Sequence, residues 1–134
     1  MVLKPFGLHH VAIQVHDLPR AARFYEQVLR LPRDEERRDA EGNVRAVWLV
    51  CGPSRIVLEQ VAASEGPAAT SAFHTDALGL HVVALQIDID DRDAWRGHLK
   101  KNAVPVVHET VYSLFVRDPE GNRIGITHYP DAVA

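Results

Sequence analysis

The sequence has little of several features that would assign a protein class by themselves. Its 134 residues include one cysteine, Cys51, so no disulfide can form within the chain. No apolar run approaches the roughly 20 residues that a transmembrane helix needs, and the opening residues MVLKPFGLHH lack the apolar core of a signal peptide. We therefore expect a cytoplasmic protein with no membrane partner.

An excess of one charge is also missing. The 15 basic and 18 acidic side chains give a formal net charge of -3, which predicts no surface for nucleic acid or an anionic membrane. The sequence shows no Ser-His-Asp order, phosphate loop or zinc-finger spacing. With 46% apolar and 25% charged residues, the chain is an ordinary globular protein that we expect to bind small molecules or other proteins.

One segment of the sequence occurs twice. Residues 8–16 read LHHVAIQVH and residues 80–88 read LHVVALQID, at an offset of 72 positions. Alternating aliphatic side chains predict a strand in each copy, with His10, Ala12 and Gln14 on one face of the first. At the position of His10 in the first copy, the second copy has Val82. The repeat indicates two related halves, of which only the first has a histidine at this position.

Each copy of the repeat opens a similar order of elements. In the first half we predict a strand over 9–15, a helix capped by Asp17 and ended by Pro32, a polar edge strand or loop over 33–45, and strands over 46–50 and 55–61. Residues 62–79 are small and polar, which indicates a connector. The second half should contain a strand over 81–89, a helix capped by Asp90 or Asp91, and strands over 104–109, 112–116 and 123–129.

These elements predict an α+β fold with a single domain over residues 1–134. The domain consists of two βαβββ modules, 1–61 and 80–134, joined by the connector 62–79. A helix covers only one face of each sheet, so the other apolar face needs a partner. We therefore predict that the modules, paired within one chain or between chains, form a curved mixed sheet around a cavity.

Two stretches resemble a known family. HHVAIQVHDLPRAARFYEQVL is similar to the first strand and helix of the vicinal oxygen chelate superfamily, and LFVRDPEGNRIGI is similar to its closing hairpin. This superfamily includes glyoxalase I, methylmalonyl-CoA epimerase, extradiol dioxygenases, fosfomycin-resistance enzymes and bleomycin-resistance proteins. Arg30 departs from the family pattern, which has glycine there. The resemblance implies the glyoxalase/bleomycin-resistance/dioxygenase fold and a homodimer.

The resemblance also implies a divalent metal, held by one side chain from the first and the last strand of each half. His10 matches the first ligand, whereas Val82 and Gly125 stand where a histidine and a glutamate are expected. The fourth ligand position, in the last strand of the first half, is ambiguous. The pattern VLEQ places it at Glu59, whereas alignment with RIGIT in the second half places it at Val57. The metal ligands would then be His10 and Glu59 at most, and catalytic zinc usually has three protein ligands. We expect no cofactor, with Zn, Ni, Fe or Mn as the alternative.

Five residues are predicted to bind a small-molecule ligand: His10, Gln14, Glu59, Gln86 and Tyr112. The first four fall on the predicted cavity side of their strands, and the tyrosine begins a strand that borders the cavity in the family. Amide and carboxylate groups suit a neutral or cationic polar ligand. For Glu59 and His10 a solvated strand position is an equal alternative, and for Tyr112 an edge tyrosine at a sheet margin.

Other conspicuous side chains are interpreted as structural. Strand parity places His9 and His81 on the helix side, as core or rim histidines. Trp48 and Phe115 are expected to serve packing, and Cys51 to act as a small hydrophobe beside a turn.

Two functions remain open. The first is a metal-free binding protein that resembles the bleomycin-resistance branch, with a degenerate or absent metal site. The alternative is a metal-dependent lyase, isomerase or dioxygenase acting on a substrate with vicinal oxygens. Whether the protein is an enzyme is left undecided, because two groups facing the cavity could also transfer protons without metal.

Overall fold

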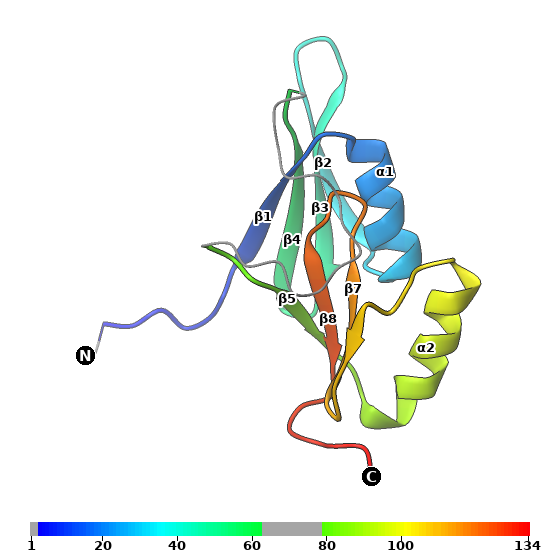
Figure 1. Cartoon of the computed structure of the whole chain (residues 1–134). Helices are drawn as coiled ribbons and strands as arrows, with labels where there is room; N and C mark the ends of the chain where they lie inside the picture. The colour runs from blue at the N-terminus through cyan, green and yellow to red at the C-terminus, as the bar shows by residue number, and fades with distance from the viewer. Residues whose placement is uncertain (1–2, 63–78) are drawn as a thin grey trace. The chain divides into compact units, whose positions relative to one another are not determined.

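The computed structural model describes residues 3–62 and 79–134, so most of the predicted connector lies outside the described residues. The chain divides into two compact units, Met1–Glu65 and Gly66–Ala134. Each unit contains a four-stranded mixed sheet and a helical segment between its first two strands (Figure 1). The predicted α+β fold with two βαβββ modules is therefore confirmed.

The first unit follows the predicted order of elements closely. Its strands are β1 (His10–Val15), β2 (Arg33–Arg38), β3 (Val44–Cys51) and β4 (Ser54–Gln60), and its helix α1 (Leu18–Arg23) continues into a π-helical turn η1 (Phe24–Val28). The sheet order is β1-β4-β3-β2, with β1 parallel to β4 and the other pairs antiparallel. The first and last strands of the unit are thus neighbours.

The helix α1 begins where the sequence predicts. The Asp17 carboxylate accepts a hydrogen bond from the Arg20 backbone N–H at 3.1 Å, and Pro19 lies in the first turn, where its missing N–H costs nothing. Tyr25 and Leu29 are buried on the side of the helical segment that packs on the sheet. The segment ends at Arg30, whose φ of 60° explains why glycine suits this position in the family.

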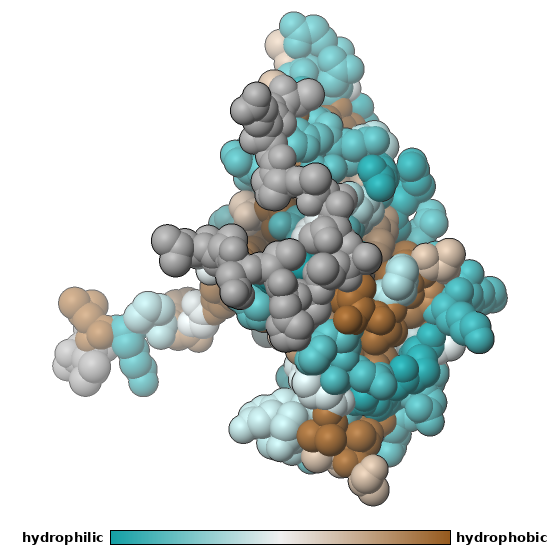
Figure 2. All heavy atoms as spheres, in the orientation of Figure 1, coloured by the Kyte–Doolittle hydropathy of each residue, from teal (hydrophilic) through white to brown (hydrophobic). Residues whose placement is uncertain are grey.

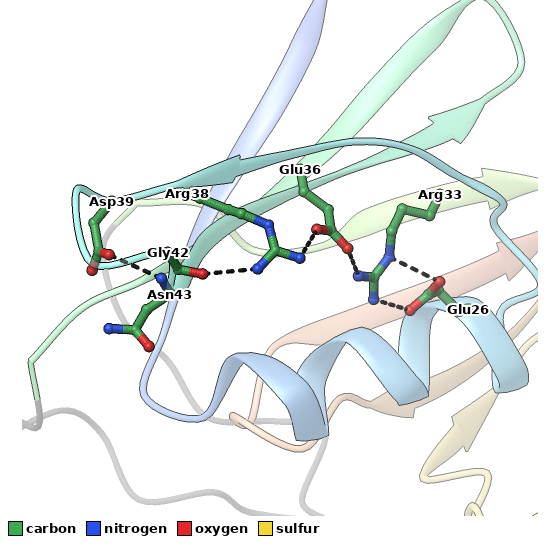
Figure 3. Close-up of polar contacts among 7 residues, drawn as sticks. All are labelled: Glu26, Arg33, Glu36, Arg38, Asp39, Gly42 and Asn43. Atoms are coloured by element: carbon green, nitrogen blue, oxygen red, sulfur yellow. Dashed lines mark hydrogen bonds and ion pairs between the residues drawn. The ribbon is translucent and has the colours of Figure 1, made fainter.

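The edge strand β2 carries a chain of charged contacts (Figure 3). Arg33 donates to Glu26 at 2.6 Å and to Glu36 at 2.7 Å, and Arg38 donates to the other oxygen of Glu36 at 2.8 Å. Hydrogen bonding to Arg33 lowers the pKa of the Glu36 carboxyl. An exposed, fully charged edge strand disfavours pairing with another chain along that edge.

The second unit has shorter strands than predicted. They are β5 (Val83–Gln86), β6 (His108–Glu109), β7 (Ser113–Arg117) and β8 (Arg123–Thr127), in the order β5-β8-β7-β6. Again the first strand is parallel to the last. The predicted strand over 104–109 is reduced to its last two residues, because Pro105 cannot donate a backbone hydrogen bond to a neighbouring strand.

The second helix begins at the predicted aspartates and is preceded by a capped 3₁₀ turn. A 3₁₀ turn, η2 (Ile89–Asp91), precedes α2 (Arg92–Lys101), and the Asp88 carboxylate accepts from the Asp90 N–H at 2.9 Å. Asp88 has extended backbone angles that let its side chain reach the turn, whereas Asp91 makes no capping hydrogen bond through its side chain. Asp91 is therefore the N-cap residue of α2, as the prediction of Asp90 or Asp91 allowed, but the capping hydrogen bond from a side chain is made by Asp88 at the preceding 3₁₀ turn.

A buried polar network closes the second unit. Arg92 at the start of α2 donates to Nε2 of His128 and to the Thr110 carbonyl, both at 2.9 Å, and is 7% exposed. Because arginine only donates, His128 accepts through Nε2 and donates from Nδ1 to the carbonyl of Asp131. The network ties the helix start to the loop before β7 and to the C-terminal segment.

Arg92→Met should lower the free energy of unfolding by about 2–3 kcal/mol, because it leaves the buried Nε2 of His128 unpaired and removes a hydrogen bond to the partly buried Thr110 carbonyl. Arg96→Met on the same helix is the matched control: Arg96 pairs with Glu109 at 2.7 Å, but both side chains are more than two-fifths exposed. Its loss should cost roughly 0.5 kcal/mol. Urea unfolding of the three proteins measures both values, and equal losses would contradict a special role for the buried network.

Candidate functional site

Strand register in the first unit decides which predicted site residues are neighbours. On the β1–β4 pair, Gln14 lies opposite Glu59, and His10 lies opposite Arg55. These residues share one face of the sheet, but four strand positions separate the His10 level from the Glu59 level, which is roughly 13 Å along the strand. The structure therefore brings Gln14 and Glu59 together, and it places His10 at the other end of the same face.

His10 belongs to an aromatic cluster that the sequence did not predict. His9 Nδ1 and His10 Nδ1 are 2.9 Å apart, and the His10 ring lies 4.9 Å from that of Trp48 on β3. The prediction that His9 faces the helix was wrong: its ring is 6.5 Å from Trp48, and the residue is exposed. His9 precedes the first residue of β1, so strand alternation does not govern its direction.

Trp48 also carries an unusual polar atom. Its indole Nε1 is buried and has no hydrogen-bond partner among the described residues. A tryptophan that served packing alone would normally satisfy this donor. The available sequence signal was the histidine pair HH. The registers of the structure put Trp48 on the same face as Val57 and hence as His10.

In the second unit, the predicted residues Gln86 and Tyr112 are not neighbours. Gln86 is exposed and lies opposite Thr127, whose hydroxyl accepts from Ser113 Oγ at 2.8 Å. Tyr112 precedes β7, and its ring packs against Tyr129 with the centroids 5.0 Å apart. At the level of Gln86 and Thr127, the neighbouring strand β7 places Ser113 on the same face of the sheet.

The two parallel strand pairs also assign the equivalent positions of the repeat. Ala12 lies opposite Val57 in the first unit, and Ala84 lies opposite Gly125 in the second. Because Ala12 and Ala84 correspond in the repeat, Val57 corresponds to Gly125. Val57 is 1% exposed and has no metal-binding atom in its side chain. Glu59, the alternative suggested by the pattern VLEQ, corresponds to Thr127.

The closing position at Gly125 is covered by a neighbouring ring. A Cβ atom added there would lie 3.1 Å from Cε1 of Phe115 and 3.6 Å from the Ala84 Cβ. Phe115 is the direct cross-strand partner of Gly125. Phe115 thus crowds this position: glycine has no ligand atom, and a longer side chain would have to displace the ring.

These positions do not fit the metal that the family implies. Within residues 3–62 and 79–134, no three His, Cys, Asp or Glu side chains are grouped so that they could hold a metal ion. His10 and Glu59 are too far apart along the sheet to bind one ion together. Cys51 is also a poor nucleophile, because burial raises the pKa of its thiol and so disfavours the reactive thiolate.

A cavity lies beside the aromatic cluster in the first unit. It has a volume of about 470 Å³ and is lined by residues 4–9 of the N-terminal segment and by Pro53 and Ser54 of the β3–β4 turn. Figure 1 shows this segment extending away from β1, and Figure 2 shows apolar side chains on it. Leu3, Phe6 and Leu8 are 92%, 104% and 65% exposed. His9 is shared by the cavity and the cluster.

Two βαβββ units, each closed by a parallel pair of strands, define the class of glyoxalase-type folds. The family model described as Glyoxalase/Bleomycin resistance protein/Dioxygenase superfamily matches residues 7–126. The chain belongs to this superfamily, as its resemblance to vicinal oxygen chelate proteins predicted. Within the described ranges, no helix is long and apolar enough to cross a membrane.

Solved structures share the fold at low sequence identity. A glyoxalase/dioxygenase from Nostoc punctiforme matches with a TM-score of 0.77 and 20% identity, covering 98% of both chains. Lactoylglutathione lyase from Agrobacterium tumefaciens matches with a TM-score of 0.67 and 22% identity, covering 93% of this chain and 95% of that one. The fosfomycin resistance protein FosX from Mesorhizobium loti matches with a TM-score of 0.69 and 16% identity, covering 92% of both chains. No curated protein matches the sequence significantly.

Gly125→Ala should lower the free energy of unfolding by about 1–2 kcal/mol, because its Cβ would press on Phe115. Gly97→Ala is the control: Gly97 lies in α2 with no atom near the added Cβ, so alanine should raise stability by about 0.5–1 kcal/mol. Adding Phe115→Leu to Gly125→Ala should recover part of the loss in a double-mutant cycle. A stabilising Gly125→Ala would show that the ring does not occupy this space.

Proposed function

We propose that this protein binds a small molecule without a resident metal, as a glyoxalase-superfamily member whose metal site is degenerate. The observation that carries the proposal is Gly125 beneath the ring of Phe115, at the position where the family places its closing carboxylate. Val82 and Val57 likewise offer no donor at the other two family positions. A scaffold that retains the fold but not the ligand set keeps the capacity to bind.

The polar groups that remain suit recognition of a ligand. Gln14 and Glu59 lie opposite each other at one end of the β1–β4 face, and Gln86 is exposed on the corresponding strand of the second unit. Amides both donate and accept, and a carboxylate accepts, so these groups favour a neutral or cationic polar molecule over a phosphate. His10→Ala and Glu59→Gln should weaken binding without unfolding the protein, since neither residue belongs to the buried core.

The second candidate is a metal-dependent lyase, isomerase or dioxygenase acting on a substrate with vicinal oxygens. It is favoured by His10, which keeps the family's first ligand position, and by the similarity to a lactoylglutathione lyase and a glyoxalase/dioxygenase. This function would need ligands from outside the positions described above. A direct measurement of metal content separates the two candidates.

Protein purified without an affinity tag should contain less than a tenth of an equivalent of Zn, Ni, Mn or Fe by elemental mass spectrometry. Its melting temperature should change by less than about 1 °C with a chelator or with one equivalent of each ion, because an ion that does not bind contributes no stability. A rise of several degrees with one ion, abolished by His10→Ala, would favour the metal enzyme.

Restoring the family ligands should require removal of the covering ring. Val82→His with Gly125→Glu should bind no metal, because Phe115 fills the space of the new carboxylate. The triple variant with Phe115→Ala in addition should bind Zn or Ni in a calorimetric titration. Equal binding by the double and triple variants would show that Phe115 is not the obstacle.

We also propose that the protein is a cytoplasmic homodimer. The exposed side chains of Leu3, Phe6, Leu8 and Leu80 are apolar groups that a partner chain would remove from water. Sedimentation velocity at micromolar concentration should give a mass near twice the 14.9 kDa of the chain. A single species at the mass of one chain would contradict the dimer.

A further inference from the structure

The cluster of His9, His10 and Trp48, with the cavity beside it, is a second feature of the first unit that the metal chemistry of the family does not explain. We propose that this cluster is the recognition subsite for a planar cyclic amide, a flat ring with a carbonyl next to a ring N–H. The inference rests on the proposed function, because it names the class of small molecule that the protein binds.

The first support is the unpaired donor. Trp48 Nε1 is buried without a hydrogen-bond partner within the described part of the chain. Native proteins satisfy almost all such groups, so this donor is open to a partner that residues 3–62 and 79–134 do not supply. The tryptophan as a whole is partly exposed, but its Nε1 is buried, so a ligand oxygen reaches the indole N–H when the ring turns toward solvent. That oxygen is an acceptor, as in a carbonyl.

The second support is the state of the histidine pair. Their Nδ1 atoms are 2.9 Å apart, so one donates and the other accepts. When both rings are neutral, the donating ring leaves its Nε2 as an acceptor, and the accepting ring carries an Nε2–H. The cluster therefore offers two donors, including the indole, and one acceptor. A cyclic amide supplies the matching acceptor and donor on adjacent atoms.

The third support is the arrangement of the rings. The His9 ring stands at 79° to that of His10 and at 78° to that of Trp48, whereas His10 and Trp48 are tilted by 50° at 4.9 Å. The rings thus form a corner, in which a flat ligand can stack on one ring and meet the edge of another. This geometry favours a planar body over a flexible chain.

The adjacent cavity provides space for the body of the ligand. Its volume of about 470 Å³ lies within the range of about 300–1,000 Å³ that is common for small-molecule sites. Pro5, Phe6, Leu8 and Pro53 give it an apolar lining, and Lys4 is its one charged lining residue within the described part of the chain. An uncharged aromatic body fits these walls, while His9 joins them to the polar cluster.

The test uses 2-quinolone as the probe and nuclear magnetic resonance of the indole N–H groups. The chain has two tryptophans, and Trp95→Phe assigns the signals; this variant also serves as a control, because Trp95 lies on α2 in the other unit. Titration of wild-type protein with 2-quinolone should move the Trp48 Nε1–H signal downfield as it gains an acceptor. The Trp95 signal should stay in place.

Two comparisons establish the chemistry of the subsite. Quinoline has the same ring shape without the carbonyl, and it should bind at least fivefold more weakly than 2-quinolone. Trp48→Phe keeps an aromatic ring without the N–H, and it should weaken 2-quinolone binding at least fivefold, as followed through backbone signals. If this variant does not fold, the comparison of 2-quinolone with quinoline on wild-type protein still tests whether the carbonyl and ring N–H are recognised.

Several results would overturn the subsite. These are an unmoved Trp48 signal at millimolar 2-quinolone, equal binding of quinoline, or tighter binding of 2-naphthoate, which would indicate a site for carboxylates. A probe that moves the backbone signals of Gln14 and Glu59 but not the indole would refute the subsite and leave small-molecule binding standing. A stoichiometric metal would instead refute the proposed function, and it is detected independently by elemental analysis.

Discussion

The parallel pairing of the first and last strand within each unit is the constraint on which the rest of the structure depends. It joins β1 to β4 and β5 to β8, so residues more than 40 positions apart become direct neighbours. The register of each pair fixes which side chains share a level on the sheet. Every candidate ligand position is defined by these two registers, and a shift by one residue would turn each of them to the opposite face.

These registers explain why the two copies of the repeat differ in chemistry while they agree in fold. Ala12 and Ala84 occupy equivalent positions, and their partners are Val57 and Gly125. A glycine at a strand centre gives up packing, but here the ring of Phe115 lies against it and restores the packing. At this position the sheet carries an apolar layer of Gly125, Phe115 and Ala84 in place of a charged side chain.

The first unit shows the opposite tendency, because it keeps polar groups on its face. Gln14 and Glu59 lie together at one level, and His9, His10 and Trp48 gather at the other. Within the described residues the Trp48 indole N–H is a buried donor without a partner, which costs stability.

The sequence by itself determined the order of elements, the repeat and the family, because local rules control them: the Asp17 cap, the alternation in residues 10–15 and the absence of a histidine at Val82. It failed where neighbours in space decide. The His9 ring lies against His10 and Trp48 and not on the helix side, and Tyr112 packs on Tyr129 and not beside Gln86. Only the tertiary structure showed that Val57 holds the position equivalent to Gly125, placed the Phe115 ring against that glycine, and separated His10 from Glu59. Register and ring packing arise from contacts between distant residues, which a single sequence does not encode position by position.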